Sequence, residues 1–126
     1  MSKPTTYEDA AKAVMTYVKA RDWHKNPPRG LAISIVLEAT ELLEYYQWQD
    51  ESFGDKKDLG SEAADVLIYL IQFAHHYDID LPDEVMKKLA ISEKKYPAEI
   101  FQIKDEVARN KAWLEAKLSY KKDTTL

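Results

Sequence analysis

The chain has 126 residues, with no cysteine, three glycines and five prolines, and 45% of its positions are hydrophobic. At this length a folded domain buries roughly two thirds of the surface that its unfolded chain exposes, so a hydrophobic core needs no disulfide or metal support. The lack of cysteine excludes disulfides, zinc-thiolate sites and thiol nucleophiles. The formal net charge of −4 argues against binding to duplex nucleic acid, because such binding needs a basic face.

The sequence also indicates a location. No apolar N-terminal run follows a basic start, as a signal peptide would require, and the longest apolar stretches carry carboxylates in their middle. We therefore expect a cytoplasmic protein without a membrane-spanning segment. A small anionic ligand is compatible with the acidic charge if a metal ion or a few placed cations receive it.

Hydrophobic residues recur at helical spacing, and no stretch alternates apolar and polar residues for long enough to form a sheet. The expected fold class is all-α, an antiparallel bundle of about four core helices with an additional C-terminal helix. The first helix should start where Thr5 and Glu8 fit a capping box and end near Arg21. A loop over residues 22–30 should follow, because two adjacent prolines there cannot continue a helix.

Further turn signals divide the rest of the chain. We expect a second helix over residues 31–48, a polar connection, and a third helix over residues 58–77. The fourth helix should begin at Asp80 as N-cap and stop before Tyr96. A fifth should follow Pro97 as one continuous helix, with a frayed tail from Lys121. Its predicted apolar face consists of Ile100, Ile103, Val107, Leu114 and Leu118.

Two acidic pairs interrupt the most apolar of these helices. Glu38 and Glu41 lie three residues apart in the second helix, and Glu62 and Asp65 lie three apart in the third. If the two helices pair antiparallel, as their short connection suggests, four carboxylates converge on one pocket. Such a cluster needs protons or a cation, and oxygen ligands without His or Cys favour Mg²⁺, Mn²⁺ or Ca²⁺ over zinc.

Two other interpretations compete with this metal site. For any single glutamate, a solvated position or an ordinary ion pair is the commoner outcome. A di-iron carboxylate bundle requires Glu-x-x-His motifs on two helices, and this chain has none. Because both pairs occur on strongly apolar helices, we favour a Mg²⁺ site, with Mn²⁺ as the alternative ion.

The acidic pairs belong to a longer pattern. Glu38-Ala-Thr-Glu41 and Glu62-Ala-Ala-Asp65 are separated by 20 residues. Around them stand Arg21-Asp22-Trp23, Pro28-Arg29, Gln47-Trp48 and Lys94-Lys95-Tyr96-Pro97. This pattern resembles the all-α nucleoside triphosphate pyrophosphohydrolases of the MazG-like group, particularly their dCTP pyrophosphatase-like branch. We predict a MazG-like domain over residues 1–98, to which residues 99–126 add an amphipathic helix and a frayed tail.

The resemblance implies hydrolysis of a nucleoside triphosphate to the monophosphate and pyrophosphate. The metal would be bound by Glu38, Glu41, Glu62 and Asp65, with Glu41 activating the attacking water. The resemblance also implies contacts with the nucleotide. The alternative for each of these side chains is an ordinary position on the surface or in the core. The predicted contacts are base stacking by Trp23 and Trp48, lining of the pocket by Tyr69 and Tyr96, and phosphate binding by Arg29, Lys88 and Lys95.

Three positions depart from the dCTP-specific branch. Asn26 and Gly30 replace a histidine and an asparagine around the Pro-Arg step, and Ser92 replaces an asparagine, so the preferred base and sugar are left open.

The two most apolar helices expose more hydrophobic surface than the shorter helices of one chain can bury. We therefore expect a homodimer or homotetramer. A non-catalytic helical oligomerisation or binding protein is the alternative function.

Overall fold

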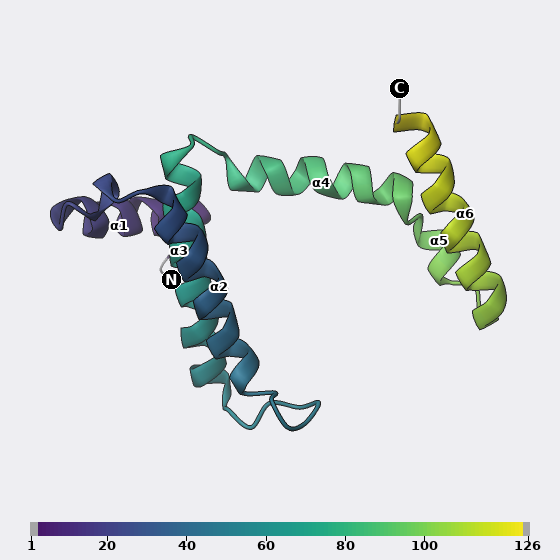
Figure 1. Ribbon diagram of the computed structural model, residues 1–126, viewed down its shortest axis with the longest axis horizontal. Coiled ribbons are helices and arrows are strands. Elements are labelled where there is room, and N and C mark those ends of the chain that lie inside the picture. The colour runs from purple at the N-terminus through teal and green to yellow at the C-terminus, as the bar shows by residue number, and fades with distance from the viewer. Residues whose placement is uncertain (1–2, 125–126) are drawn as a thin grey trace. The chain divides into compact units, whose positions relative to one another are not determined.

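The computed structural model describes residues 3–124 and the side chains of residues 3–121, and all its regular elements are helices. The all-α prediction is confirmed. The chain divides into two compact units, one up to Ile79 and one from Asp80, whereas the predicted boundary at residue 98 stays a prediction. The first unit contains α1 (Tyr7–Ala20), the 3₁₀ helix η1 (Trp23–Lys25), α2 (Pro28–Glu44) and α3 (Lys56–His76); the second contains α4 (Leu81–Lys95), α5 (Ala98–Phe101) and α6 (Glu106–Thr124) (Figure 1).

Helix α1 begins one residue later than the capping pattern suggested. Thr6, not Thr5, is the N-cap: its hydroxyl accepts from the Asp9 amide at 3.1 Å, and the Asp9 carboxylate accepts from the Thr6 amide at 3.0 Å. The predicted pair of Thr5 and Glu8 is therefore wrong by one position, because Asp9 at the third helical position closes the capping box equally well.

Both ends of α2 differ from the prediction. The helix starts at Pro28 rather than after residue 30, since proline at the first helical position loses no hydrogen bond and already has a helical φ angle. It ends at Glu44, four residues before Trp48. The amides of Tyr46 and Gln47 bond to carbonyls three residues earlier, which tightens the chain into turns. Trp48 consequently lies in the connection between α2 and α3.

Helices α2 and α3 form the antiparallel hairpin that the sequence predicted, lying side by side and joined at one end by a loop (Figure 1). Asp55 caps α3 by accepting from the Asp58 amide at 2.9 Å, and Asp58 accepts from the Asp55 amide at 3.1 Å. Because the hairpin is antiparallel, the residues in the middle of α2 face those in the first half of α3.

The loop of this hairpin closes over an aromatic ring. Phe53 donates its amide to the Tyr45 carbonyl at 3.1 Å, and the two rings pack 5.4 Å apart. A Cβ atom built on Gly54 would lie only 2.6 Å from Cε1 of Tyr45, so the backbone approaches the ring more closely than any side chain permits. Glycine is required at this position by that contact.

Gly54→Ala is expected to lower the free energy of unfolding by about 1 to 3 kcal/mol, because the added methyl group must displace the half-buried Tyr45 ring. Gly60→Ala is the matched control. No atom lies within 4 Å of a Cβ at that helical position, so alanine should raise stability by about 0.5 to 1 kcal/mol. Urea unfolding at one protein concentration measures both changes, and equal effects of the two substitutions would contradict this view of the loop.

In the second unit, α4 has the predicted start and end: Asp80 accepts from the Asp83 amide at 3.1 Å, and Tyr96 is the C-cap. The prediction of one continuous fifth helix is wrong. The helix stops after Phe101 and restarts at Glu106, where the Asp105 carboxylate accepts from the Ala108 amide at 2.8 Å.

Helix α6 packs against the end of α4 through an aromatic contact. In α6, the members Val107, Leu114 and Leu118 of the predicted apolar face are exposed in the single chain, whereas Trp113 is half-buried; that this face packs stays a prediction. Trp113 stacks on Tyr96, with ring centres 6.2 Å apart and ring planes inclined by 9°. Within this unit, α6 therefore packs through the side that carries Trp113. The predicted frayed tail starts inside α6, which runs to Thr124, and its last two positions lie outside the described residues.

The single chain buries little apolar surface. Among the described residues, the fully buried hydrophobic side chains are those of Met15, Val18, Ile71 and Ala74, from α1 and α3. Many large apolar side chains on α2, α3 and α4 stay exposed. No helix in the described range combines the length and the apolar character needed to cross a bilayer.

Candidate active site

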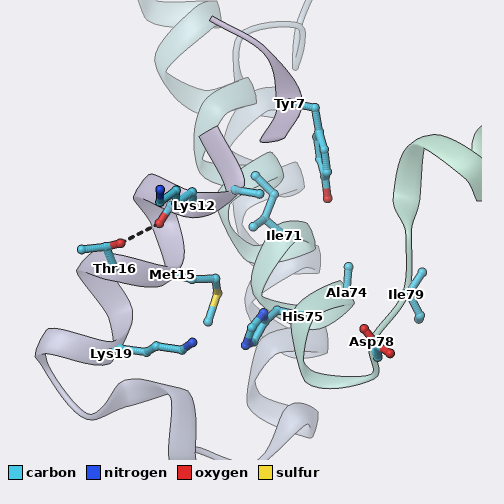
Figure 2. A pocket seen from close by; sticks show the side chains of 11 residues that line it. Tyr7, Lys12, Met15, Thr16, Lys19, Ile71, Ala74, His75, Asp78 and Ile79 are labelled. Carbon is cyan, nitrogen blue, oxygen red and sulfur yellow. Dashed lines mark hydrogen bonds between the residues drawn. The ribbon is translucent and has the colours of Figure 1, made fainter. Parts of the chain in front are cut away.

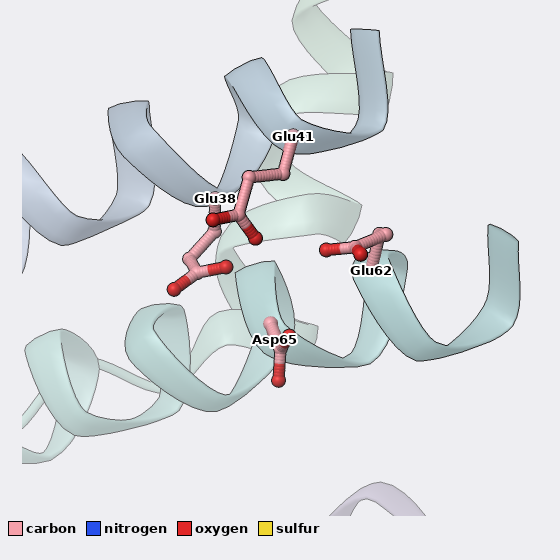
Figure 3. Close-up of side chains that lie close together, drawn as sticks. All are labelled: Glu38, Glu41, Glu62 and Asp65. Carbon is pink, nitrogen blue, oxygen red and sulfur yellow. The ribbon is translucent and has the colours of Figure 1, made fainter. Parts of the chain in front are cut away.

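Helices α2 and α3 bring the four predicted carboxylates together. Each of Glu38, Glu41, Glu62 and Asp65 offers one oxygen, and these oxygens all lie within 4.8 Å of one another. Two of the side chains come from each helix, and the four gather at one place along the hairpin (Figure 3). The three-residue spacing places each pair on one helix edge, and the antiparallel hairpin turns the two edges toward each other. The predicted convergence on one place is confirmed.

The cluster is electrostatically strained. Glu38 and Glu62 are half-buried, and the Oε2 atom of each is buried without a hydrogen-bond partner. A hydrogen bond with Glu41, then burial and the neighbouring negative charges, raise the pKa of Glu38 above its ordinary value of 4.5. Burial, then a hydrogen bond with Glu41 and the charges around it, raise the pKa of Glu62. The surrounding protein therefore resists full ionisation of this site.

These residues fit a hard divalent cation. All the gathered donors are carboxylate oxygens, which Mg²⁺, Mn²⁺ and Ca²⁺ prefer. A cation among them would give the two unpartnered oxygens of Glu38 and Glu62 a ligand to bind and would offset the repulsion that raises their pKa values. The identity of the ion stays a prediction.

We expect the metal-free protein to lose stability as the pH rises. The folded state binds the protons of Glu38 and Glu62 more tightly than the unfolded chain, so this contribution is fully present below the ordinary pKa of 4.5 and is lost through the raised pKa values. A divalent metal should oppose this loss, because its ligands must be deprotonated.

Thermal unfolding with EDTA or with excess Mg²⁺, at about pH 5 and about pH 8, tests this expectation. Mg²⁺ should raise the Tm by several degrees at the higher pH and much less at the lower one. A Mg²⁺ effect of the same size at both pH values would contradict the assignment of these carboxylates as ligands.

A cavity of about 580 Å³ adjoins the carboxylates. Glu38 and Asp65 line one part of it, while Trp23 and Tyr69, both predicted to contact the nucleotide, line other parts. The Trp23 side chain is 49% exposed and packs edge-on against Tyr17, with ring centres 5.9 Å apart. An acidic cluster and an exposed indole therefore share one cavity, as a site for a nucleotide and a cation requires.

The other predicted contacts do not line this cavity. Arg29 is exposed in the first turn of α2, and Trp48 is 84% exposed in the connection after that helix. Lys88, Lys95 and Tyr96 belong to the second unit, where the Lys95 ammonium lies 5.0 Å from the centre of the Tyr120 ring. Nucleotide contacts by these five residues stay predictions.

Sequence reasoning missed two polar side chains of the cavity, those of Tyr17 and Gln72. Tyr17 comes from α1, whose packing against the hairpin no motif specifies. Gln72 had a detectable signal, because it lies three residues after Tyr69 and seven after Asp65 and so continues the face of α3 that carries them.

A separate cavity of about 370 Å³ lies between α1 and the end of α3. Its floor includes the buried residues Met15, Ile71 and Ala74, and Lys19 and His75 stand at its side (Figure 2). It contains none of the predicted site residues.

Comparison with known proteins shows what this chain is similar to. Residues 33–109, which include both acidic pairs, match the MazG-like family. dCTP pyrophosphatase 1 from Homo sapiens is 33% identical over 108 residues, and the protein of that name from Bos taurus is 32% identical; each match covers 79% of this chain and 64% of the relative. The chain thus spans less than two thirds of the length of these curated relatives.

A solved structure of a pyrophosphatase from Archaeoglobus fulgidus DSM 4304 is also similar. It has 30% sequence identity and a TM-score of 0.65, and the match covers 77% of this chain and 98% of that one. The family match extends over more than half of the chain and contains the four clustered carboxylates. This protein belongs to the MazG-like family.

Proposed function

We propose that this protein hydrolyses a (deoxy)nucleoside triphosphate to the nucleoside monophosphate and pyrophosphate in a Mg²⁺-dependent reaction. The observation that carries the proposal is the cluster of four carboxylates at a cavity with an exposed tryptophan. The similarity to proteins named dCTP pyrophosphatase 1 supports a pyrimidine preference of the dCTP kind. The role we propose is removal of surplus or non-standard nucleotides from the cytoplasmic pool.

In this proposal Glu38, Glu41, Glu62 and Asp65 bind the metal. The metal held by these residues would supply positive charge for the phosphates and for the leaving pyrophosphate. Among the described side chains, the four carboxylates form no ion pair with Lys or Arg, so no protein cation competes with the metal there. Their uncompensated charge is what gives the site its affinity for a divalent ion.

Glu41 is proposed to orient and deprotonate the attacking water. The reaction adds water across the anhydride bond between the α- and β-phosphates: the water oxygen forms a new bond to phosphorus, the bridging P–O bond breaks, and one water proton passes to Glu41. Glu41 suits this role because it is the exposed member of the cluster, whereas the other three acids are half-buried. A carboxylate at the solvent side can receive water and return the proton.

The remaining parts of the nucleotide are assigned by chemistry. The base stacks on Trp23 in the cavity next to Tyr69, and stacking of this kind contributes about 1 to 3 kcal/mol per base. Arg29, Lys88 and Lys95 are proposed to contact the phosphates, and Tyr96 is proposed to contact the nucleotide. Because Trp48 stands 84% exposed in its own chain, we propose that it stacks on a base at an interface with another copy.

The active form is proposed to be a homodimer or homotetramer. Helix α2 exposes an apolar stripe of Ile33, Val36, Leu37 and Leu43, each between 48% and 64% exposed. Covering such side chains gains about 1.5 to 3 kcal/mol for each one that becomes fully buried. The few buried side chains of the single chain make this additional burial necessary for a stable fold.

A panel of NTPs and dNTPs assayed for pyrophosphate release with Mg²⁺, Mn²⁺ or EDTA tests the proposal. We expect release with a pyrimidine triphosphate as the best substrate and none with EDTA. A normally folded oligomer that releases no pyrophosphate from any member of the panel would refute the enzyme and favour a non-catalytic binding or oligomerisation protein.

A further inference from the structure

Gln72 places a carboxamide in the large cavity, at a position that no motif explains. It lies on α3 with Asp65 and Tyr69, and all three residues line the cavity. Their spacing of four and seven residues puts them on one helix face. At a rise of about 1.5 Å per residue, Gln72 lies roughly 10 Å along the helix from Asp65. The polar groups of this face are therefore separated into a carboxylate end and an amide end.

The same cavity is also lined by an aromatic side chain on which a flat ring can stack. Trp23 is half exposed, and its ring packs edge-on against the ring of Tyr17. The Arg21 guanidinium lies 3.6 Å from the centre of the Tyr17 ring. A base stacked on Trp23 would direct its polar edge along the cavity wall. A polar edge that enters a cavity needs partners, since unpaired donors and acceptors cost free energy. Gln72 is half-buried, and its amide is such a partner.

We propose that Gln72 is a base-binding residue that hydrogen-bonds the polar edge of a pyrimidine base. The inference rests on the proposed function and adds to it the group that reads the base. A carboxamide has both a donor and an acceptor. It donates to N3 and accepts from the exocyclic amine of cytosine; turned over, it donates to O4 and accepts from the N3–H of uracil. Gln72 therefore serves both pyrimidines and takes no part in binding the phosphates.

Gln72→Met keeps the length of the side chain and removes both hydrogen bonds. We expect the KM for dCTP and for dUTP to rise about tenfold, with kcat changed less than about twofold, because the lost contact is the same in the ground state and the transition state. The KM for a base-free deoxyribose 5′-triphosphate should not change. In Mg²⁺ buffer, calorimetry with a dCTP analogue that carries an imido group between the α- and β-phosphates should show an equal loss of affinity.

Gln102→Met is the matched control, since Gln102 is exposed at the end of α5 and does not line the cavity. If Gln72→Met lowers helicity, Gln72→Leu replaces it in the test, because leucine removes both hydrogen bonds without adding a charge to the cavity; the KM for both pyrimidine nucleotides should again rise. An unchanged KM for dCTP, or an equal rise for the base-free triphosphate, would overturn the role of Gln72 while the enzyme stands. Wild-type protein without turnover of any triphosphate would overturn the proposed function and this inference together.

Discussion

Glu41→Gln is expected to abolish pyrophosphate release, with kcat reduced by about a thousandfold or more, while the helical content stays unchanged. The substitution keeps the shape of the side chain but removes the carboxylate that is proposed to bind metal and to accept the water proton. A steady-state assay with dCTP and Mg²⁺ measures the loss, and circular dichroism confirms the fold.

The same substitution should make the metal-free protein more stable. The negative charge of Glu41 is among the causes that raise the pKa values of both Glu38 and Glu62, so its removal relieves repulsion within the cluster. Loss of activity together with a higher Tm in EDTA is a combination that a merely structural residue does not produce. Glu51→Gln is the matched control, because Glu51 is exposed in the connection between α2 and α3 and is not among the charges that raise the pKa of Glu38 or Glu62; it should leave both values close to those of the wild type.

Val36→Glu is expected to dissociate the oligomer and to unfold much of the chain. Val36 is 64% exposed in the single chain and lies in the middle of the apolar stripe of α2. In a homo-oligomer that covers this stripe, each copy would bury an unpaired carboxylate, which costs several kcal/mol, and would lose the burial of a valine as well. Sedimentation velocity should show a dimer or tetramer for the wild type and a smaller, less helical species for the variant.

Ala13→Glu is the control for this second prediction. It adds the same charge at an exposed position of α1, outside the apolar stripe, and should leave the mass and the helicity unchanged. If Val36→Glu keeps the wild-type mass and activity, then the stripe on α2 is not the contact between subunits, and another exposed apolar surface forms that contact.

Predictions of local structure from the sequence are most accurate where one side chain decides the structure. Asp80 caps α4 as predicted, because an aspartate there satisfies the free amides of the first turn whatever the rest of the chain does. The break between α5 and α6 was not foreseen, since an apolar pattern with helical spacing runs through it and only Asp105 marks the restart. Competing caps one residue apart, as at Thr5 and Thr6, have nearly the same energy by local criteria.

For the candidate site, the sequence by itself determined that two acidic pairs lie on the edges of two apolar helices, because the helical repeat brings residues three apart to one edge. Only the tertiary structure decided that all four oxygens lie within 4.8 Å of one another and that the cavity beside them is lined by Trp23 and Gln72. Residues that meet through the packing of separate helices carry no spacing rule along the chain. Their proximity depends on the antiparallel hairpin and on where α1 and η1 pack against it, which is a property of the folded chain alone.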